Sequence, residues 1–327
     1  MQSGPQFIIV SGALGSGKTS LLEALLTCED SSETAVIVNE AGEINIDGAV
    51  LSESARGMSM STLSNGCVCC SMTSDLVTTV QDLVQIRKAE RKEPFARIVL
   101  ECSGLSRPGP IVSSLQELAD LRLKLHLITT YDCSRPAIQT SDFEDAVAQL
   151  AAANTIVLTK VDLVSTERRE EALQLVVAAN PFAEVVNEFS ALVRAREAFR
   201  PRGDIGLVVG DIRSGPSERR RLLHPRIRVF RAKLHDDVLW DDALDWLENI
   251  AGVLGDRLLR VKAIVPGENQ DDRILLQSVG TTFSAPRRLL AGTIAPLGAV
   301  IIARDCGQQD LDEVESEKEV TWFDYHS

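Results

Sequence analysis

Short apolar runs alternate with stretches of helical periodicity along roughly the first 200 residues of the chain. The apolar runs are nearly continuous, which is typical of strands buried on both faces of a parallel sheet. We expect strands over residues 7–12, 34–39, 96–102, 123–132 and 155–162. We expect helices over Lys18–Leu26, Asp75–Glu93, Ile111–Leu118 and Phe143–Ala153. The pattern predicts an α/β fold, a mostly parallel sheet flanked by helices, with its functional loops at the carboxyl ends of the strands.

This rhythm stops near residue 200, where glycine, proline and a basic cluster interrupt it. Beyond the interruption, apolar strand patterns and one helical pattern near Asp241–Leu254 predict a smaller α+β domain. The expected division is a first domain over 1–205, a linker over 206–225, a C-terminal domain over 226–305 and a tail over 306–327. The tail is acidic, and we expect it to be loosely held.

Composition and charge narrow the class of protein. Of the 327 residues, 44% are hydrophobic and 25% are charged, which suits a folded chain with a real core. The net charge of −13 argues against nucleic acid and anionic membranes as partners. No apolar run approaches the roughly 18 to 20 residues that span a bilayer, and the first residues do not resemble a secretory signal. We therefore expect a cytoplasmic protein, in which an odd count of seven cysteines favours metal or redox chemistry over disulfides.

The strongest motif is GALGSGKT over residues 12–19, which matches the phosphate-binding pattern GxxxxGK[ST] between an expected strand and an expected helix. Its glycines allow backbone N–H groups to turn toward phosphates at a helix N-terminus. Lys18 is expected to act on the β- and γ-phosphates as a catalytic residue, and the Thr19 hydroxyl to complete the shell of Mg²⁺. The motif indicates that the expected sheet is that of a P-loop NTPase; an ordinary glycine-rich turn is the alternative, which the complete match disfavours. The expected nucleotide contacts are Gly12, Ala13, Leu14, Gly15, Ser16, Gly17, Lys18, Thr19 and Ser20.

A second motif indicates which nucleotide binds. Thr159, Lys160 and Asp162 end an apolar strand, where GTPases place an [N/T]KxD tetrad. The Asp162 carboxylate can accept from the ring N–H and the exocyclic amine of guanine together, which adenine does not offer. Thr159 replaces the commoner asparagine, and its hydroxyl can still tie the loop together. Ser190, followed by alanine, resembles the dipeptide that contacts the guanine oxygen in such proteins; a solvated turn is the alternative for the tetrad.

The hydrolysis side of the expected site lies in the segment IVLECSG, residues 98–104. A strand that ends in an acid, with a glycine three residues later, is typical of the loop that senses the γ-phosphate. Glu101 is expected to act as a catalytic residue by holding the Mg²⁺ shell through water, and the Gly104 N–H to sense the γ-phosphate. No glutamine can be assigned to orient the attacking water, so we expect slow intrinsic turnover.

Three cysteines, Cys67, Cys69 and Cys70, lie within four residues of one another. Thiolates select soft ions such as Zn²⁺ or Co²⁺ over Mg²⁺. Three thiols in so short a segment do not easily complete a tetrahedral set, so an open site finished by a carboxylate, water or partner is expected. A cluster of small buried side chains and a redox switch are the alternatives.

Together these motifs resemble the CobW-type GTPases, relatives of the nickel-insertion GTPases of urease and hydrogenase. The resemblance runs from residue 7 to about 303. It implies a SIMIBI-class GTPase domain followed by a small CobW-type domain, and GTP hydrolysis coupled to delivery of Zn²⁺ or Co²⁺ to a client. The matching segments are GALGSGKTSLL, VNEAGEINID, NGCVCC, LECSGLSRP, VLTKVDLV, NPFAEV and RLLRVKAIV.

The resemblance also implies roles for single residues. Cys67, Cys69 and Cys70 would be the metal thiolates, and Glu40 and Glu43 look like switch acids that could add an oxygen ligand. Asp47 could face the Mg²⁺ site; for each acid a solvated loop is the alternative. The chain departs from the family in having four scattered histidines in place of a histidine-rich tract, and Ser71-Met72-Thr73-Ser74 where an arginine is often found.

The favoured hypothesis is a GTP-hydrolysing metallochaperone with GTP, Mg²⁺ and Zn²⁺ or Co²⁺ as its ligands. Its expected partner is a client metalloprotein or metal-insertion complex, and a homodimer is possible. One rival is a metal-responsive regulator that binds GTP with little turnover, and another is a P-loop kinase with structural cysteines. The sequence names neither the physiological metal nor the client.

Overall fold

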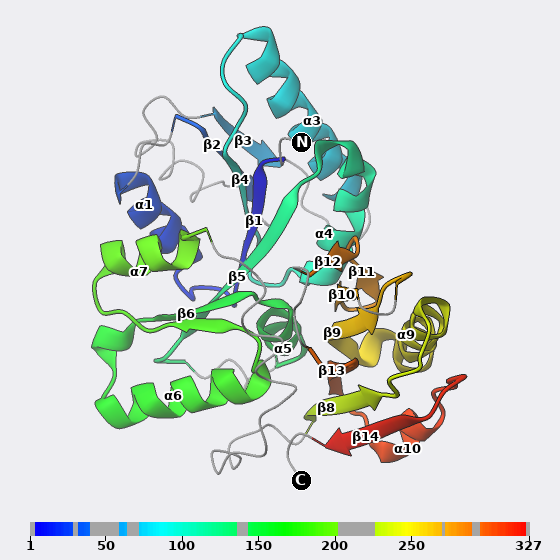
Figure 1. Cartoon of the computed structure of the whole chain (residues 1–327). Coiled ribbons are helices and arrows are strands. Elements are labelled where there is room, and N and C mark those ends of the chain that lie inside the picture. The colour runs from blue at the N-terminus through cyan, green and yellow to red at the C-terminus, as the bar shows by residue number, and fades with distance from the viewer. Residues whose placement is uncertain are drawn as a thin grey trace. The chain divides into compact units, whose positions relative to one another are not determined.

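The computed structural model describes residues 4–28, 32–39, 59–63, 72–135, 143–201, 226–269, 272–289 and 295–324 (Figure 1). The chain forms two compact units, the first made of residues 1–176 and 183–201 and the second of residues 177–182 and 202–327. Each unit has its own sheet.

Within the described residues, the first unit contains a seven-stranded sheet in the order β3-β2-β4-β1-β5-β6-β7, and every neighbouring pair is parallel. This confirms the predicted α/β class. The strands β3 and β7 are additional to the expected ones. Both are short, and they are the outermost strands of the sheet, where few apolar residues are needed. The strands are β1 (Gln6–Ser11), β2 (Thr34–Asn39), β3 (Ser59–Leu63), β4 (Arg97–Glu101), β5 (Lys124–Asp132), β6 (Thr155–Thr159) and β7 (Glu184–Val186).

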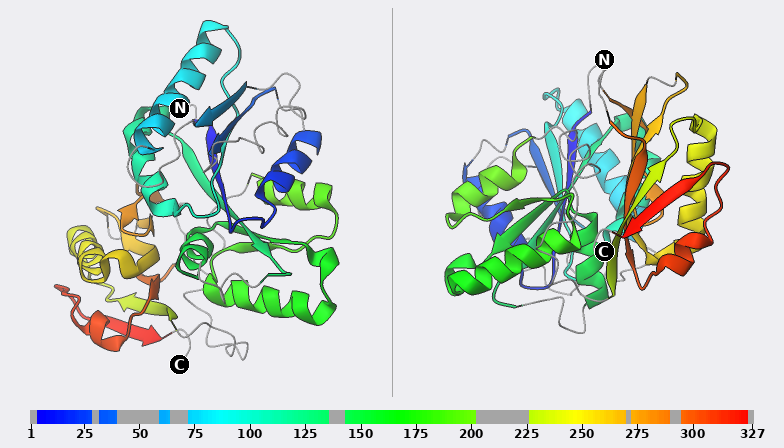
Figure 2. Two further views of the ribbon diagram at one scale, coloured as in Figure 1. Left: turned by 180° about the vertical axis from the view of Figure 1, so that it is seen from behind. Right: turned by 60° about the horizontal axis from the view of Figure 1, so that its bottom comes forward.

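Helices cover both faces of this sheet (Figures 1 and 2). α1 and α7 pack against each other, while α4 contacts both α3 and α5. Two helices, α6 and α7, are additional to the expected ones; both are rich in charged residues, which weakens the apolar periodicity. The helices are α1 (Lys18–Cys28), α3 (Met72–Ala89), α4 (Pro108–Ser114), α5 (Phe143–Ala152), α6 (Thr166–Ala179) and α7 (Ala191–Phe199).

The core under α1 and α7 is built from alternate residues of the strands. Ile8 and Val10 of β1 point into it, as do Val36 and Val38 of β2, because successive side chains of a strand point to opposite faces. The residues between them face the other helical layer and are equally buried. This explains why the strands appear in the sequence as continuous apolar runs.

The sheet order brings the motif loops together. β4, β1, β5 and β6 are consecutive neighbours, and all four run in the same direction. Their carboxyl ends therefore lie along one edge of the sheet, where ligands of open α/β sheets bind. The loops that follow β1, β4 and β6 carry the motifs singled out above, so one edge of the sheet collects them.

The second unit is built on an antiparallel sheet in the order β11-β10-β9-β13-β8-β14, with β12 paired to β10, in the part of the chain that the structure describes. α9 packs on this sheet through Trp246, Leu247 and Ile250, which are buried in the core of the unit. The elements are β8 (Ile227–Leu234), α9 (Trp240–Leu254), β9 (Leu258–Pro266), β10 (Arg273–Val279), β11 (Thr282–Phe283), β12 (Arg287–Arg288), β13 (Gly298–Arg304), α10 (Gln308–Asp312) and β14 (Val320–Asp324).

The prediction of a loosely held tail from residue 306 onward is wrong for its described part. β14 pairs antiparallel with β8, with Trp322 opposite Ala232. The Trp322 ring also packs against Trp246 of α9, at 5.7 Å between ring centroids. The acidic composition of this segment hid two aromatic residues that find partners only in the folded unit.

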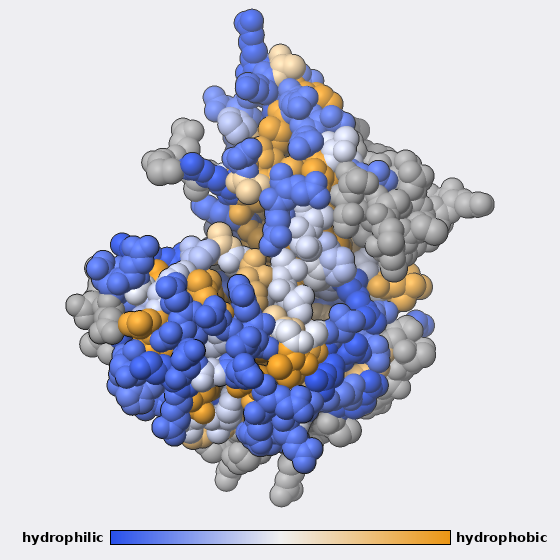
Figure 3. Space-filling model, turned by 90° about the vertical axis from the view of Figure 1, so that its right-hand side faces the viewer, coloured by the Kyte–Doolittle hydropathy of each residue, from blue (hydrophilic) through white to orange (hydrophobic). Residues whose placement is uncertain are grey.

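The face drawn in Figure 3 is mostly polar, with scattered apolar side chains, as is usual for a folded protein. None of the helices in the described ranges is long and apolar enough to cross a bilayer.

Truncating a buried core side chain of the second unit should lower the stability of that unit, and tryptophan fluorescence can follow its unfolding separately. All three tryptophans of the chain, Trp240, Trp246 and Trp322, belong to this unit, so their fluorescence follows its unfolding alone. Leu247 is 2% exposed, and Leu247→Ala should cost about 2–5 kcal/mol in urea unfolding because it leaves a cavity. Leu239, which is 54% exposed, supplies the control, and Leu239→Ala should change the free energy by less than about 0.5 kcal/mol. Equal effects would contradict the assigned core.

Candidate nucleotide-binding site

The phosphate loop joins β1 to α1 and packs tightly on β5. Gly12 has a φ of +138°, and a Cβ at this position would lie 2.3 Å from the Thr130 Oγ1. The Ser16 hydroxyl lies 2.6 Å from the same Thr130 oxygen, and both side chains are buried. Only glycine fits at position 12, because the loop turns directly over the end of β5.

Lys18 and Thr19, the first residues of α1, place two polar groups at the mouth of the loop. The Lys18 ammonium donates to the carbonyls of Gly12 and Ala13 at 3.0 and 3.2 Å, so it lies across the loop. The Thr19 hydroxyl donates to Glu101 Oε1 at 2.7 Å. This contact joins the phosphate loop to the end of β4 and sets a hydroxyl beside a carboxylate that is only 2% exposed.

The loop after Glu101 is held against the phosphate loop from two sides. A Cβ on Gly104 would lie 2.5 Å from the Leu14 nitrogen, so the two backbones touch. From α5, the buried Gln149 donates its amide to the carbonyls of Gly104 and Ser106, each at 3.0 Å. Two hydrogen bonds from one buried side chain fix the loop orientation, because either carbonyl would otherwise lose a partner.

Thr159 links the tetrad to the phosphate loop. Its hydroxyl lies 2.7 Å from the Ser16 carbonyl and 3.1 Å from the Tyr131 carbonyl, and the side chain is 4% exposed. A hydroxyl therefore bridges three elements, β6, β5 and the phosphate loop. This is the tie that the sequence suggested for a threonine in place of asparagine.

The second residue of the tetrad is oriented by an acid that sequence reasoning missed. Lys160 has a φ of +53°, and its ammonium donates to Asp132 Oδ2 at 2.5 Å. Burial would raise the pKa of Asp132, but hydrogen bonds from Lys160 and from the side chain and backbone of Ser134 lower it below its ordinary value. Asp132 thus stays charged and fixes the direction of the lysine stem.

The remaining residues that we expect to contact the base lie on neighbouring loops. Asp162 follows β6 and Ser190 follows β7, and these strands are parallel neighbours. Both side chains are exposed. Ser190 is the N-cap of α7, and its hydroxyl accepts from the Val193 N–H at 3.5 Å. A carboxylate and a helix N-terminus therefore stand at adjacent strand ends.

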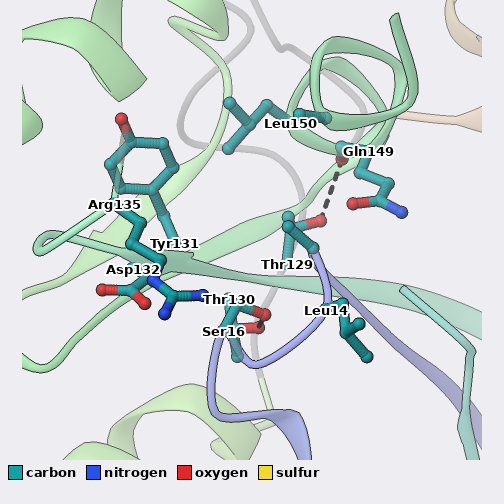
Figure 4. A pocket seen from close by; sticks show the side chains of 11 residues that line it. Leu14, Ser16, Thr129, Thr130, Tyr131, Asp132, Arg135, Gln149 and Leu150 are labelled. Atoms are coloured by element: carbon teal, nitrogen blue, oxygen red, sulfur yellow. Dashed lines mark hydrogen bonds between the residues drawn. The ribbon is translucent and has the colours of Figure 1, made fainter. Parts of the chain in front are cut away.

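A pocket of about 150 Å³ lies beside the phosphate loop, between β5 and α5 (Figure 4). In this view Leu14 and Ser16 come from the phosphate loop, and Arg135 reaches over Asp132 from the segment after β5. The Thr129 hydroxyl closes the far side by donating to the Gln149 carbonyl at 2.9 Å. The lining residues are Ala13, Leu14, Ser16, Thr129, Thr130, Tyr131, Asp132, Arg135, Ala146, Gln149 and Leu150.

The expected metal ligands Cys67, Cys69, Cys70, Glu40 and Glu43, and with them Asp47, lie outside the described residues. In the described ranges no group of three His, Cys, Asp or Glu side chains could hold a metal ion.

Three of the cysteines that the structure describes are buried thiols with raised pKa values. Burial raises the pKa of Cys102 to about 12, and it raises those of Cys133 and Cys306 to about 11. Each stays protonated at neutral pH and is a poor metal ligand.

Asp132 and Gln149 are the supporting residues that motif reasoning did not find. Asp132 ends an expected strand, and an acid at the carboxyl end of a parallel strand was the one signal available. Gln149 gave no signal, because it lies in a helix and its partners are about 45 residues away in the chain.

Removing the Thr159 hydroxyl should loosen the phosphate loop. Thr159→Val keeps the shape but leaves the carbonyls of Ser16 and Tyr131 without this donor, so unfolding should require about 1–3 kcal/mol less. Urea unfolding followed by circular dichroism measures the change. Thr27→Val is the matched control, since Thr27 is exposed and its hydroxyl donates to the Glu23 carbonyl within α1. A variant as stable as the control would argue against the tie.

Comparison with curated proteins finds relatives of similar length. The chain is 29% identical to the zinc chaperone YjiA of Escherichia coli (strain K12), over 85% of this chain and 86% of that protein. It is also 29% identical to the zinc chaperone CobW of Pseudomonas aeruginosa, over 92% of this chain and 88% of that protein.

Among solved structures, the Zn(II)-bound YjiA GTPase of E. coli matches with a TM-score of 0.64, over 96% of this chain and 100% of that one. At 20% identity this likeness shows the fold. The family model described as CobW/HypB/UreG, nucleotide-binding domain, matches residues 6–187, which include the phosphate loop, the segment after β4 and the tetrad. The chain belongs to the CobW/HypB/UreG family.

Proposed function

We propose that this protein is a GTP-hydrolysing metallochaperone that binds Zn²⁺ or Co²⁺ through its CxCC motif and delivers it to a client protein in the cytoplasm. The observation that carries the proposal is the meeting of three motifs, the phosphate loop, the segment after β4 and the tetrad, along one sheet edge. Its relatives include two named zinc chaperones and a zinc-regulated GTPase metalloprotein activator from Dictyostelium discoideum.

The phosphates would be held by the backbone N–H groups of residues 12–19 at the N-terminus of α1. Lys18 would move its ammonium from the loop carbonyls to the β- and γ-phosphate oxygens, which offer a full negative charge in place of a dipole. Gly104 would present its N–H to the γ-phosphate, and Gln149 would hold the loop in that orientation.

The donor set at the loop mouth fits Mg²⁺. Thr19 and Glu101 both offer side-chain oxygens, the donor type that this hard cation prefers, and these two oxygens lie 2.7 Å apart. The hydroxyl would bind the cation directly, and the carboxylate would hold its shell through water. When bound, Mg²⁺ neutralises charge on the transferring phosphate.

The base would bind where the ends of β6 and β7 meet. Asp162 would accept from the guanine ring N–H and amine, and Lys160 would lie along the purine face, held there by Asp132. The Ser190 region would face the guanine oxygen. This pairing of groups disfavours a P-loop kinase that uses ATP.

The metal site would form where the chain leaves two neighbouring strands. β2 and β3 are paired in parallel, with Asn39 opposite Leu63, so their continuations start side by side at the same sheet edge. Glu40 follows β2 directly, and Cys67 follows β3 by four residues. Carboxylate and thiolates thus arise from adjacent points. Three strand spacings of about 4.8 Å separate β3 from β1, so the two strands lie about 14 Å apart. The metal site and the phosphate site would then be near enough to influence each other.

The proposed cycle couples these sites. GTP would order the segment that carries Glu40 and Glu43 beside the cysteines and tighten the metal site, and hydrolysis would release it. Because the metal ion is cargo, losing one ligand would lower the metal affinity enough for transfer. A tenfold change in that affinity needs only about 1.4 kcal/mol. A client protein would accept the ion, and a homodimer remains part of the proposal. The rival is a GTP-binding regulator with little turnover.

Exchanging the base-reading acid should switch the nucleotide. Asp162→Asn puts an amide N–H₂ where guanine also presents donors, so GTP affinity should fall by at least about tenfold. Xanthine carries a carbonyl in place of the amine, so affinity for its triphosphate should rise. Binding measured by calorimetry tests both. Glu167→Gln, at an exposed acid of α6, is the control and should change neither affinity. A variant that still prefers GTP would sink the base assignment.

The cysteine motif should set metal affinity in a nucleotide-dependent way. Replacing Cys67, Cys69 and Cys70 by serine should abolish stoichiometric Zn²⁺ binding, because serine gives no soft donor. Cys28→Ser, at a partly exposed cysteine of α1, should leave it intact. In the unaltered protein, affinity for Zn²⁺ should be at least about tenfold higher with a non-hydrolysable GTP analogue than with GDP. Equal affinities would remove the coupling while leaving GTP binding untouched.

A further inference from the structure

Two arginines from different helices bind the loop between β7 and α7 through hydrogen bonds and ring stacking. Arg169, near the start of α6, donates from Nε to the Asn187 side-chain oxygen and from Nη2 to the Asn187 carbonyl, both at 2.6 Å. Its guanidinium also lies over the Phe189 ring, 4.1 Å from the centroid. Planar stacking and paired donation together fix both ends of a short segment.

Arg194, in the first turns of α7, folds back onto the same loop. Its Nε and Nη2 donate to the Glu188 carbonyl at 2.9 and 2.7 Å, and Nη2 donates to the Phe189 carbonyl at 3.0 Å. Burial lowers the pKa of Arg194, while the nearby charge of Asp162 works in the opposite direction. The same guanidinium is therefore close to the base-reading carboxylate.

The grip leaves the loop with a defined polarity. Three successive carbonyls, those of Asn187, Glu188 and Phe189, are taken up by the two guanidinium groups. In a trans peptide the carbonyl of one residue and the N–H of the next point in opposite directions. With the Phe189 carbonyl held by Arg194, the Ser190 N–H is turned away from the guanidinium.

This polarity matters for the base. Guanine presents a carbonyl acceptor at position 6, where adenine presents an amino donor. A loop that offers N–H groups therefore favours guanine, whereas one that turned a carbonyl outward would favour adenine. Ser190 and the first residues of α7 begin a helix, whose leading N–H groups lack intrahelical acceptors.

We infer that Arg169 and Arg194 are positioning residues that set guanine selectivity, by holding the 187–190 loop so that its backbone donors face position 6 of the base. The inference rests on the proposed function, since it takes guanine as the base. It assigns the discrimination to two separate devices. Asp162 reads the amine at position 2, and the arginine-held loop reads the oxygen at position 6.

Three nucleotides separate these devices. Inosine triphosphate keeps the oxygen at position 6 but lacks the amine, and ATP lacks both features. Arg194→Ala in the full chain should lower affinity for GTP and for inosine triphosphate by a similar factor, about tenfold, and leave ATP binding unchanged. The ratio of GTP to inosine triphosphate affinity, which reports on Asp162, should stay constant. Arg169→Ala should act in the same direction.

The controls are the neighbouring arginines. Arg168 pairs with Glu171 on α6, and Arg196 is exposed on α7; neither donates to the 187–190 loop in the described residues, so Arg168→Ala and Arg196→Ala should keep wild-type selectivity. If Arg194→Ala does not fold, Arg194→Lys serves instead, because one ammonium does not reproduce the forked donation and should still lower the GTP to ATP ratio.

The outcomes are distinct. A wild-type chain that binds GTP no better than ATP overturns the proposed function itself. A wild-type chain that prefers GTP, with Arg169 and Arg194 variants that keep the same GTP to ATP ratio, overturns this inference alone. A uniform loss of affinity for all three nucleotides also overturns it, because that is what a purely structural role of the arginines predicts.

Discussion

The site depends on the parallel hydrogen bonding of four neighbouring strands, β4, β1, β5 and β6, whose carboxyl ends meet at one sheet edge. Each strand end delivers one polar element to this edge. β1 delivers the phosphate loop, β4 delivers Glu101, β5 delivers Asp132 and β6 delivers Thr159 and the tetrad. The strands themselves are buried on both faces, so the edge is rigid where the loops are attached.

Buried polar contacts then lock the loops to one another. Thr159 holds Ser16, Gln149 holds Gly104, and Thr19 meets Glu101, and each of these contacts joins segments that are far apart in the chain. A buried polar group that loses its partner costs more than the bond contributes, so such a network specifies one arrangement strongly. This is why small substitutions at these positions are expected to matter beyond their size.

The same sheet also accounts for the proposed link between nucleotide and metal. The candidate acids follow β2 and the cysteines follow β3, two paired strands at the same edge as the phosphate loop. A change that starts at the γ-phosphate would therefore have a short route to the proposed metal ligands through neighbouring strand ends. At the other end of the same edge, the loop after β7 that Arg169 and Arg194 hold would contact the base. The carboxyl edge of the sheet would then combine metal, phosphate and base recognition.

The sequence by itself determined the features that are local. The phosphate loop, the acid at the end of β4 and the tetrad are short motifs that can be found in the sequence. The continuous apolar runs predicted five of the strands, because buried parallel strands need that composition. Tertiary structure alone decided the partners of these motifs. Asp132 reaches Lys160 across 28 residues, and Gln149 reaches Gly104 across 45. The pairing of β14 with β8 and the packing of Trp322 against Trp246 are also decided by tertiary structure. Hydrogen bonds and ring contacts between distant segments leave no local pattern, because they depend on which strands become neighbours and not on which residues are adjacent in the chain.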